Sequence, residues 1–297
     1  MKRLGYLPPT ALAALLLHPA WPSYATDRFD YGAGAALPAV SGRNGKIAAG
    51  GGGFDDNGFG FVEGSFSLPV SQSIGFQADG LGGGSSEGGI AGGGAHLFWR
   101  DPSTGLAGVY GGVTWADASV QDYTHFAVGF EGQAYLGRVS VESVLGYEGG
   151  HDVEKGFFAI GDLAYYPVDD LKLYAGVRYI QKDVLGAGGI EYQLQSSSSF
   201  GSGLALFGEG RVHDDDRWQA WGGIRFYFGE NKSLIRRHRE DDPGNINKEF
   251  LFDVNSGTGG VPINTGNSSG NTTPPAEPKP QPEPQPEPQP EPDTEPT

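Results

Sequence analysis

The middle of the chain alternates between apolar and polar residues with a period of two. Within Leu171–Ile180, apolar side chains take every second position, while Lys172, Tyr174, Gly176 and Arg178 take the positions between them. Successive side chains of a β-strand point to opposite faces. The pattern therefore predicts a strand with one apolar face and one polar face.

Neighbouring segments repeat this alternation and are separated by turn residues. Tyr123–Leu136 is followed by Gly137 and Arg138, and Pro167–Asp170 separates another pair of alternating segments. Such pairs predict hairpins. About twelve segments come near the nine to eleven residues that a tilted strand needs to cross a bilayer, and a count of ten, with one pair absorbed into loops, stays open. The expected strands are Lys46–Phe54, Phe59–Ser67, Ser73–Leu81, Gly89–Trp99, Leu106–Trp115, Tyr123–Leu136, Val139–Tyr147, Gly156–Tyr166, Leu171–Ile180, Val184–Leu194, Phe200–His213 and Arg217–Phe228.

Charges of both signs recur in the middle of the expected strands. Inside a barrel such charges stay solvated or pair across strands, so we take them as candidates for lining a lumen. They are Glu131, Glu142, Asp162, Lys172, Arg178, Glu191, Glu209, Arg211 and Arg225.

The strand faces opposite to the charged ones are apolar. Aromatic residues gather near the ends of these expected strands. This arrangement is typical of the two aromatic girdles that border the lipid-facing band of a membrane barrel. The girdle candidates are Trp99, Trp115, Tyr147, Tyr165, Tyr166, Trp218 and Phe228.

Composition narrows the classes of protein that fit this pattern. The formal net charge of −16 argues against a generic nucleic-acid binder, which needs a basic surface. The chain has no cysteine, which excludes disulfides, thiolate nucleophiles and Cys-ligated zinc. The 51 glycines suit a sheet that coils and closes on itself. After the N-terminal region no apolar run is long enough for a transmembrane helix.

The last expected strand carries a family signal. Gly222, Ile224, Phe226 and Phe228 occupy alternate positions and end on an aromatic residue. This resembles the C-terminal β-signal of Gram-negative outer-membrane β-barrels, and the wider pattern resembles small porin-like or opacity-type surface barrels. The resemblance covers Lys46–Phe228 as a pattern only. It implies an all-β fold, a closed antiparallel up-and-down transmembrane barrel, with outer-membrane lipid and the barrel-assembly machinery as partners. The chain departs from the family by continuing far beyond Phe228.

The two ends of the chain differ from its middle. Lys2 and Arg3, followed by a short apolar run and Ser23–Ala25, predict a signal peptide over residues 1–25. We expect a periplasmic lead-in over residues 26–45, the barrel over 46–229 and a charged, then polar linker over 230–273. A disordered Pro/Glu-rich tail is predicted for 274–297, where Pro stands at nearly every second position.

The linker opens with a cationic cluster formed by Arg236, Arg237, His238 and Arg239. Because the tail follows the last strand, we expect it in the periplasm. There it either serves as an acidic spacer or contacts peptidoglycan or a periplasmic protein.

Candidate catalytic and metal-binding groups are few. His125 with Ser140 or Ser143 is the one conceivable nucleophile pair, and no local motif of a barrel lipase accompanies it. The acidic runs Asp55–Gly58 and His213–Arg217 lack the spacing of a calcium loop and predict hairpin tips. No residue is therefore assigned to catalysis, a cofactor or a metal.

These observations predict a non-catalytic outer-membrane barrel, either a narrow porin-like channel or a structural surface protein. The two readings have equal weight at this point. A lipid-modifying barrel enzyme and a secreted soluble all-β adhesin are the alternatives.

Overall fold

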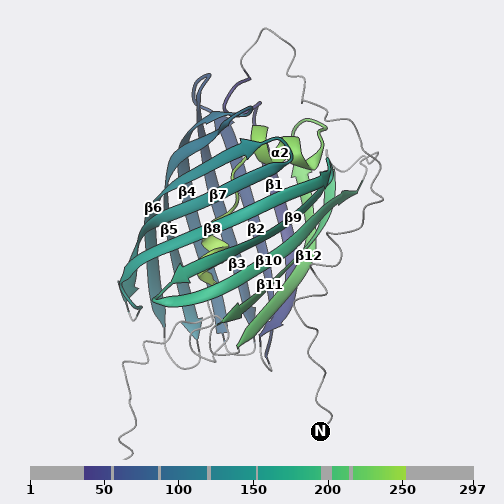
Figure 1. Cartoon of the computed structure of the whole chain (residues 1–297). Helices are drawn as coiled ribbons and strands as arrows, with labels where there is room; N and C mark the ends of the chain where they lie inside the picture. The colour runs from purple at the N-terminus through teal and green to yellow at the C-terminus, as the bar shows by residue number, and fades with distance from the viewer. Residues whose placement is uncertain are drawn as a thin grey trace, which may run out of the picture. The chain divides into compact units, whose positions relative to one another are not determined.

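The chain folds into a closed barrel of twelve antiparallel strands (Figure 1). The computed structural model describes residues 37–54, 57–85, 88–118, 122–151, 153–194, 203–213 and 217–251. Each strand pairs with its neighbours in sequence, and β1 pairs with β12 to close the sheet. The prediction of a closed up-and-down barrel is confirmed, with twelve strands and not ten. The strands are β1 (Asn44–Phe54), β2 (Asn57–Pro69), β3 (Ile74–Ser85), β4 (Gly88–Asp101), β5 (Gly105–Ala118), β6 (Tyr123–Leu136), β7 (Val139–His151), β8 (Gly156–Val168), β9 (Leu171–Ile180), β10 (Asp183–Leu194), β11 (Gly203–His213) and β12 (Trp218–Phe228).

Glycine-rich stretches extend several strands beyond their expected ends. β3 continues past Leu81 to Ser85, where Gly84 pairs with Gly89 and Ser85 pairs with Gly88 at the start of β4. A run of glycines has no side chains that could alternate. Its backbone N–H and C=O groups still need hydrogen-bond partners, because lipid offers none. Gly75 has a separate role, since a Cβ there would meet the Phe98 ring and Val40 Cγ2 at 2.5 Å.

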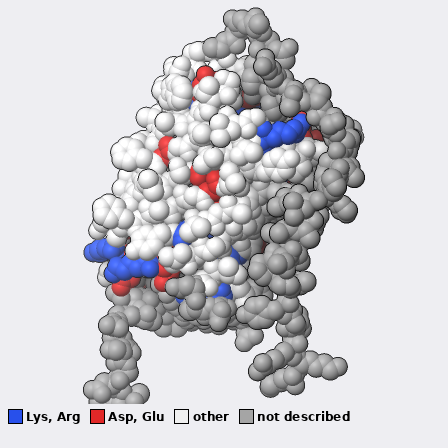
Figure 2. All heavy atoms as spheres, in the orientation of Figure 1, with Lys and Arg blue, Asp and Glu red and all other residues white. Residues whose placement is uncertain are grey.

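The outer face of the barrel is apolar. Phe130, Leu145 and Phe157 expose 74%, 60% and 77% of their surface and point away from the barrel interior. Charged side chains are sparse on the face shown in Figure 2. A soluble sandwich buries such residues between its sheets, so the alternative of a soluble all-β protein fails. The outer face is a lipid-facing band.

Aromatic residues border this band at both ends of the strands. Trp99, Tyr165 and Phe228 are exposed at one end, and Trp115, Tyr147 and Trp218 are exposed at the other. Tyr166 was expected in the girdle, and this expectation is wrong. It is fully buried inside the barrel, because it follows the outward-facing Tyr165 directly and adjacent strand residues face opposite ways.

The two mouths of the barrel differ in the strand ends and turns that lie there. We call the mouth where β1 begins and β12 ends the terminal mouth; the turns 70–73, 102–104, 137–138 and 169–170 lie there. The opposite mouth is called the far mouth. Two short helices follow β12, α2 (Leu234–Glu240) and α3 (Asn247–Leu251). Neither they nor any other helix of the described residues is long and apolar enough to cross a membrane. The expected signal peptide and the Pro-rich tail lie outside the described residues.

Leu145→Arg tests the lipid-facing band. Leu145 lies in the middle of β7 and faces outward. We expect a loss of about 2–4 kcal/mol in unfolding free energy, the usual cost of arginine at the bilayer midplane of a barrel. Urea unfolding of the barrel in lipid vesicles, followed by tryptophan fluorescence, measures it.

Val70→Arg is the matched control, because Val70 is also exposed but lies in the turn after β2. Its expected cost is about 0–1 kcal/mol. Equal costs at the two positions would mean that the band does not face lipid.

Candidate functional site: the plugged lumen

The nine candidate lumen residues all point into the barrel. Glu131, Glu191, Glu209, Arg211 and Arg225 are buried there, as is Arg178, while Glu142, Asp162 and Lys172 are partly buried. All of them except Arg211 line an internal cavity of about 130 Å³. The structure thus gathers charges from seven expected strands around one space.

Ion pairs between strands hold most of these charges. Lys172 Nζ lies 3.0 Å from Glu142 Oε1, and Arg178 Nη1 lies 2.6 Å from Asp162 Oδ1. Gly176 makes the second pair possible, because a Cβ at this position would collide with the Asp162 carboxylate.

Arg225 joins β12 to two other strands. Its Nη1 donates to Glu191 Oε2 at 2.6 Å, and its Nη2 donates to Glu63 Oε1 at 2.8 Å. Glu191 also accepts a hydrogen bond from Tyr227 Oη.

A buried histidine completes the wall. His96 Nε2 lies 2.8 Å from Asp79 Oδ2, and His96 Nδ1 lies 2.9 Å from Glu131 Oε2. His96 and Asp79 are not among the lumen residues predicted from the sequence. Their inward direction follows from alternation along β3 and β4, but only the strand register brings them together.

The lumen is occupied by the chain's own residues 229–251, which we call the plug. From its composition this stretch is expected to form a linker that follows the barrel. Instead, Leu234 and Ile235 of α2 are fully buried, and the wall caps the helix. Asp170 Oδ1 accepts a hydrogen bond from Leu234 N at 3.1 Å, and Asp169 O accepts one from Ile235 N at 2.9 Å.

The cationic cluster of α2 explains why a charged segment folds inward. Arg237 Nε donates to Gln193 Oε1 at 2.7 Å, and its guanidinium lies over the Tyr227 ring. Arg239 Nη2 donates to Ser140 Oγ at 3.2 Å. Each buried guanidinium has a polar or aromatic partner on the wall, which burial of a charge requires.

His238 bridges two wall tyrosines. Its Nδ1 lies 2.9 Å from Tyr166 Oη, and its Nε2 lies 3.2 Å from Tyr227 Oη. Burial lowers the pKa of His238 well below its ordinary value; Glu191 opposes this shift, and Lys172 adds to it. The imidazole is therefore neutral near pH 7, with one ring nitrogen able to donate and the other able to accept.

The chain between α2 and α3 is fixed to β1 and β3. Lys46 Nζ forms an ion pair with Asp242 and donates to Pro243 O at 3.1 Å. Gln77 Nε2 donates to the same carbonyl at 3.2 Å. Nearer to β12, Lys232 Nζ lies 2.7 Å from Asp241 Oδ1.

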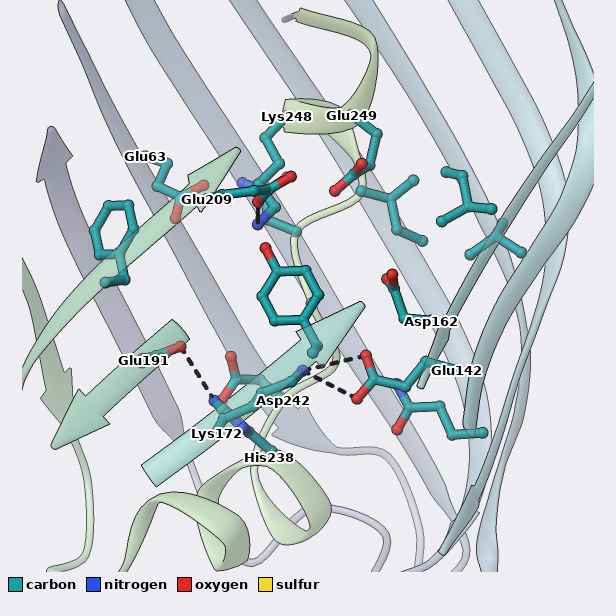
Figure 3. A pocket seen from close by; sticks show the side chains of 18 of the residues that line it. Glu63, Glu142, Asp162, Lys172, Glu191, Glu209, His238, Asp242, Lys248 and Glu249 are labelled. Carbon is teal, nitrogen blue, oxygen red and sulfur yellow. Dashed lines mark hydrogen bonds and ion pairs between the residues drawn. The ribbon is translucent and has the colours of Figure 1, made fainter. Parts of the chain in front are cut away.

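Glu249 of α3 is held by two wall arginines. Its Oε2 accepts from Arg178 Nε at 2.8 Å and from Arg211 Nη2 at 2.7 Å. Lys248 lies 3.3 Å from Glu209 on β11. Figure 3 shows Lys248 and Glu249 extending from α3 into the cavity, above the Lys172–Glu142 pair.

Phe250 packs beside these ion pairs. Its ring lies 5.1 Å from that of Phe158 in an edge-to-face arrangement and 4.7 Å from the imidazole of His125. The plug is thus anchored by both charge and apolar contact.

The candidate nucleophile pair is not assembled. His125 Nε2 is bonded to Glu148 Oε2 at 3.1 Å. In the register of β6 and β7, Ser140 and Ser143 lie roughly 20 Å or more from His125 along the strands. The described residues contain no cluster of three side chains suited to a metal ion. Asp55, Asp56 and residues 214–216 lie outside them.

Comparison with known proteins finds barrels of related architecture. No family model matches the chain, and no curated protein does. Among solved structures, the chain is similar to the KdgM porin in complex with disordered oligogalacturonate (13% identity, TM-score 0.47, 62% of this chain and 99% of that one). It is also similar to the outer membrane protein Omp33 of Acinetobacter baumannii (13%, 0.38, 63% and 99%). A third is outer membrane phospholipase A of Escherichia coli (11%, 0.40, 74% and 98%).

At these identities no function can be transferred, so the lumen residues must decide what the barrel does. The closed barrel, its outward apolar band and its charged interior are the architecture of a barrel that crosses a membrane.

Glu249→Ala tests the anchoring of the plug. It removes the carboxylate shared by Arg178 and Arg211, and breaking a buried ion pair costs about 3–5 kcal/mol. We expect trypsin to cut the variant rapidly at the arginines of α2, while the wild-type barrel in detergent micelles is cut slowly there. Mass spectrometry of the fragments measures both rates.

Glu230→Ala is the matched control. Glu230 is exposed, and its carboxylate lies 3.7 Å from Lys232 Nζ, so its loss costs about 0–1 kcal/mol. If Glu249→Ala and Glu230→Ala resist trypsin equally, Glu249 does not anchor the plug.

Proposed function

We propose that this protein is a narrow, non-catalytic channel of the outer membrane, closed by its own plug. The observation that carries the proposal is the polar contact between plug and wall. Hydrogen bonds and ion pairs bind residues 232–249 to the strands, from Gln193 near the terminal mouth to Arg178 near the far mouth.

A barrel that never opens could do without such contacts if the wall and the plug were both apolar. Well-packed apolar side chains in place of buried ion pairs are often neutral or more stable. When the plug leaves, in contrast, the polar groups of wall and plug exchange their hydrogen bonds with each other for hydrogen bonds with water, at a small net cost in free energy. The chemistry of the interface therefore favours a plug that can be displaced.

The wall alone suits a water-filled passage. Twelve strands make a barrel wider than the eight-strand type that side chains fill, and narrower than sixteen-strand porins. Carboxylates outnumber cations among the described strand residues that are buried inside or line the cavity, so the unplugged lumen prefers cations weakly. The carboxylates are Glu63, Asp79, Glu131, Glu142, Glu148, Asp162, Glu191 and Glu209; the cations are Lys46, Arg100, Lys172, Arg178, Arg211 and Arg225.

A permanently closed structural barrel is the second candidate. The double arginine contact of Glu249 favours it, because this anchor is costly to break. The lipid-modifying enzyme has no such support, since His125 and the two serines lie far apart. In both remaining candidates the outer membrane is the site of action, and we infer that the terminal mouth faces the periplasm.

Conductance in planar bilayers separates the two candidates. We expect no steps from the wild-type protein or from a chain ending at Leu251, which keeps the plug. A chain ending at Gly229, and the full-length Asp242→Ala/Glu249→Ala variant, should give discrete, weakly cation-selective steps.

Each variant is first shown to be a closed barrel by its heat-dependent shift on an SDS gel. Folded, unplugged barrels that give a flat trace would exclude the channel and leave the structural barrel. Equal steps from the wild-type protein and the unplugged variants would show that the plug does not close the lumen.

A further inference from the structure

The plug enters the lumen at the terminal mouth. It follows β12 directly, and α2 is bonded to the turn Asp169-Asp170 and to Val139 O, which begins β7 beside another turn of this mouth. Figure 1 shows α2 at one end of the barrel.

From α2 the plug runs in one direction along the lumen. Pro243 is bonded to Lys46 and Gln77, both close to the terminal-mouth ends of their strands. Lys248 then reaches Glu209, in the middle of β11. The contacts therefore move steadily away from the terminal mouth.

The plug ends close to the far mouth. Glu249 is bonded to Arg178 and Arg211, which lie close to the far ends of β9 and β11. Phe250 packs on His125 and Phe158, close to the far ends of β6 and β8. Residues 229–251 thus pass from one mouth nearly to the other.

Among the described residues, the inner part of the plug packs against the wall. Ile246 and Phe250 pack into one apolar cluster with Tyr110, Phe158 and Ile180 on the wall. The cavity between plug and wall measures about 130 Å³. A cavity of this size holds water but not a second pass of polypeptide beside the described part of the plug.

We propose that the chain leaves the barrel through the far mouth, so that its C-terminus lies on the opposite side of the membrane from the end of β12. With the terminal mouth in the periplasm, the acidic Pro/Glu/Gln repeat of residues 274–297 is presented at the cell surface. The proposal differs from the expectation of a tail in the periplasm that serves as a spacer or contacts peptidoglycan or a periplasmic protein. The proposal is independent of whether the plug is ever displaced.

Cysteine labelling on intact cells tests the proposal, since the chain itself has no cysteine to interfere. Thr297→Cys marks the C-terminus. Val70→Cys marks the terminal mouth, and Asp122→Cys marks the far mouth, because they lie in the turn after β2 and the loop before β6. A maleimide carried on a bulky polyethylene glycol, which does not cross the outer membrane, labels only the outer side.

We expect Thr297→Cys and Asp122→Cys to be labelled on intact cells, and Val70→Cys only after lysis. The proposal is overturned if Thr297→Cys labels together with Val70→Cys, whichever side that is. Labelling of Val70→Cys and not of Asp122→Cys would show that the barrel has the opposite orientation in the membrane. Even then the proposal requires Thr297→Cys to follow Asp122→Cys.

Discussion

Closing a β-sheet on itself in lipid imposes the constraint on which the rest of this structure depends. Every backbone group must pair within the barrel, and every outward side chain must tolerate hydrocarbon. The charged side chains in the middle of the described strands are therefore directed inward. Twelve strands enclose more space than their own side chains fill, so buried charges such as Arg178 and Arg211 need partners that the wall supplies only in part. The plug supplies further partners, such as Glu249 for both arginines.

The same constraint explains the chemistry of the plug. A segment that fills a charged lumen has to be charged itself, with the opposite sign at each contact. Glu249 meets two arginines, Asp242 meets Lys46, and Lys248 meets Glu209. A purely apolar plug would have left these wall charges buried without partners, at a cost of several kcal/mol for each ion.

The barrel could be predicted from the sequence because a period of two is visible in single residues. β6 and β9 begin and end at the expected residues. The inward direction of charges such as Glu131 and Arg178 follows from the same alternation. The ends of glycine-rich strands could not be located, because glycine shows no alternation. Tyr166 could not be separated from the girdle residue Tyr165 by residue type alone, since both are aromatic and only the alternation of faces distinguishes them.

The plug could not be predicted in the same way. A segment that carries Arg236–Glu240 has the composition of a solvated linker, and helices as short as α2 and α3 have no clear hydrophobic period. The one signal was the set of isolated apolar residues in this polar stretch, Leu234, Ile235, Ile246 and Phe250. Each is buried in the structure. Their partners are scattered over the wall, and only the closed barrel brings them together.

Hydrogen–deuterium exchange of the intact protein in lipid nanodiscs tests the central claim, that residues 229–251 fill the lumen. The amides of α2 and α3 should then exchange slowly, close to the rates of the strand amides and far below those of an unfolded peptide. In the Glu249→Ala variant their exchange should accelerate while the strands stay protected. Exchange of residues 234–251 at the rate of a free peptide in the wild-type protein would contradict the account, because the segment would then lie outside the barrel.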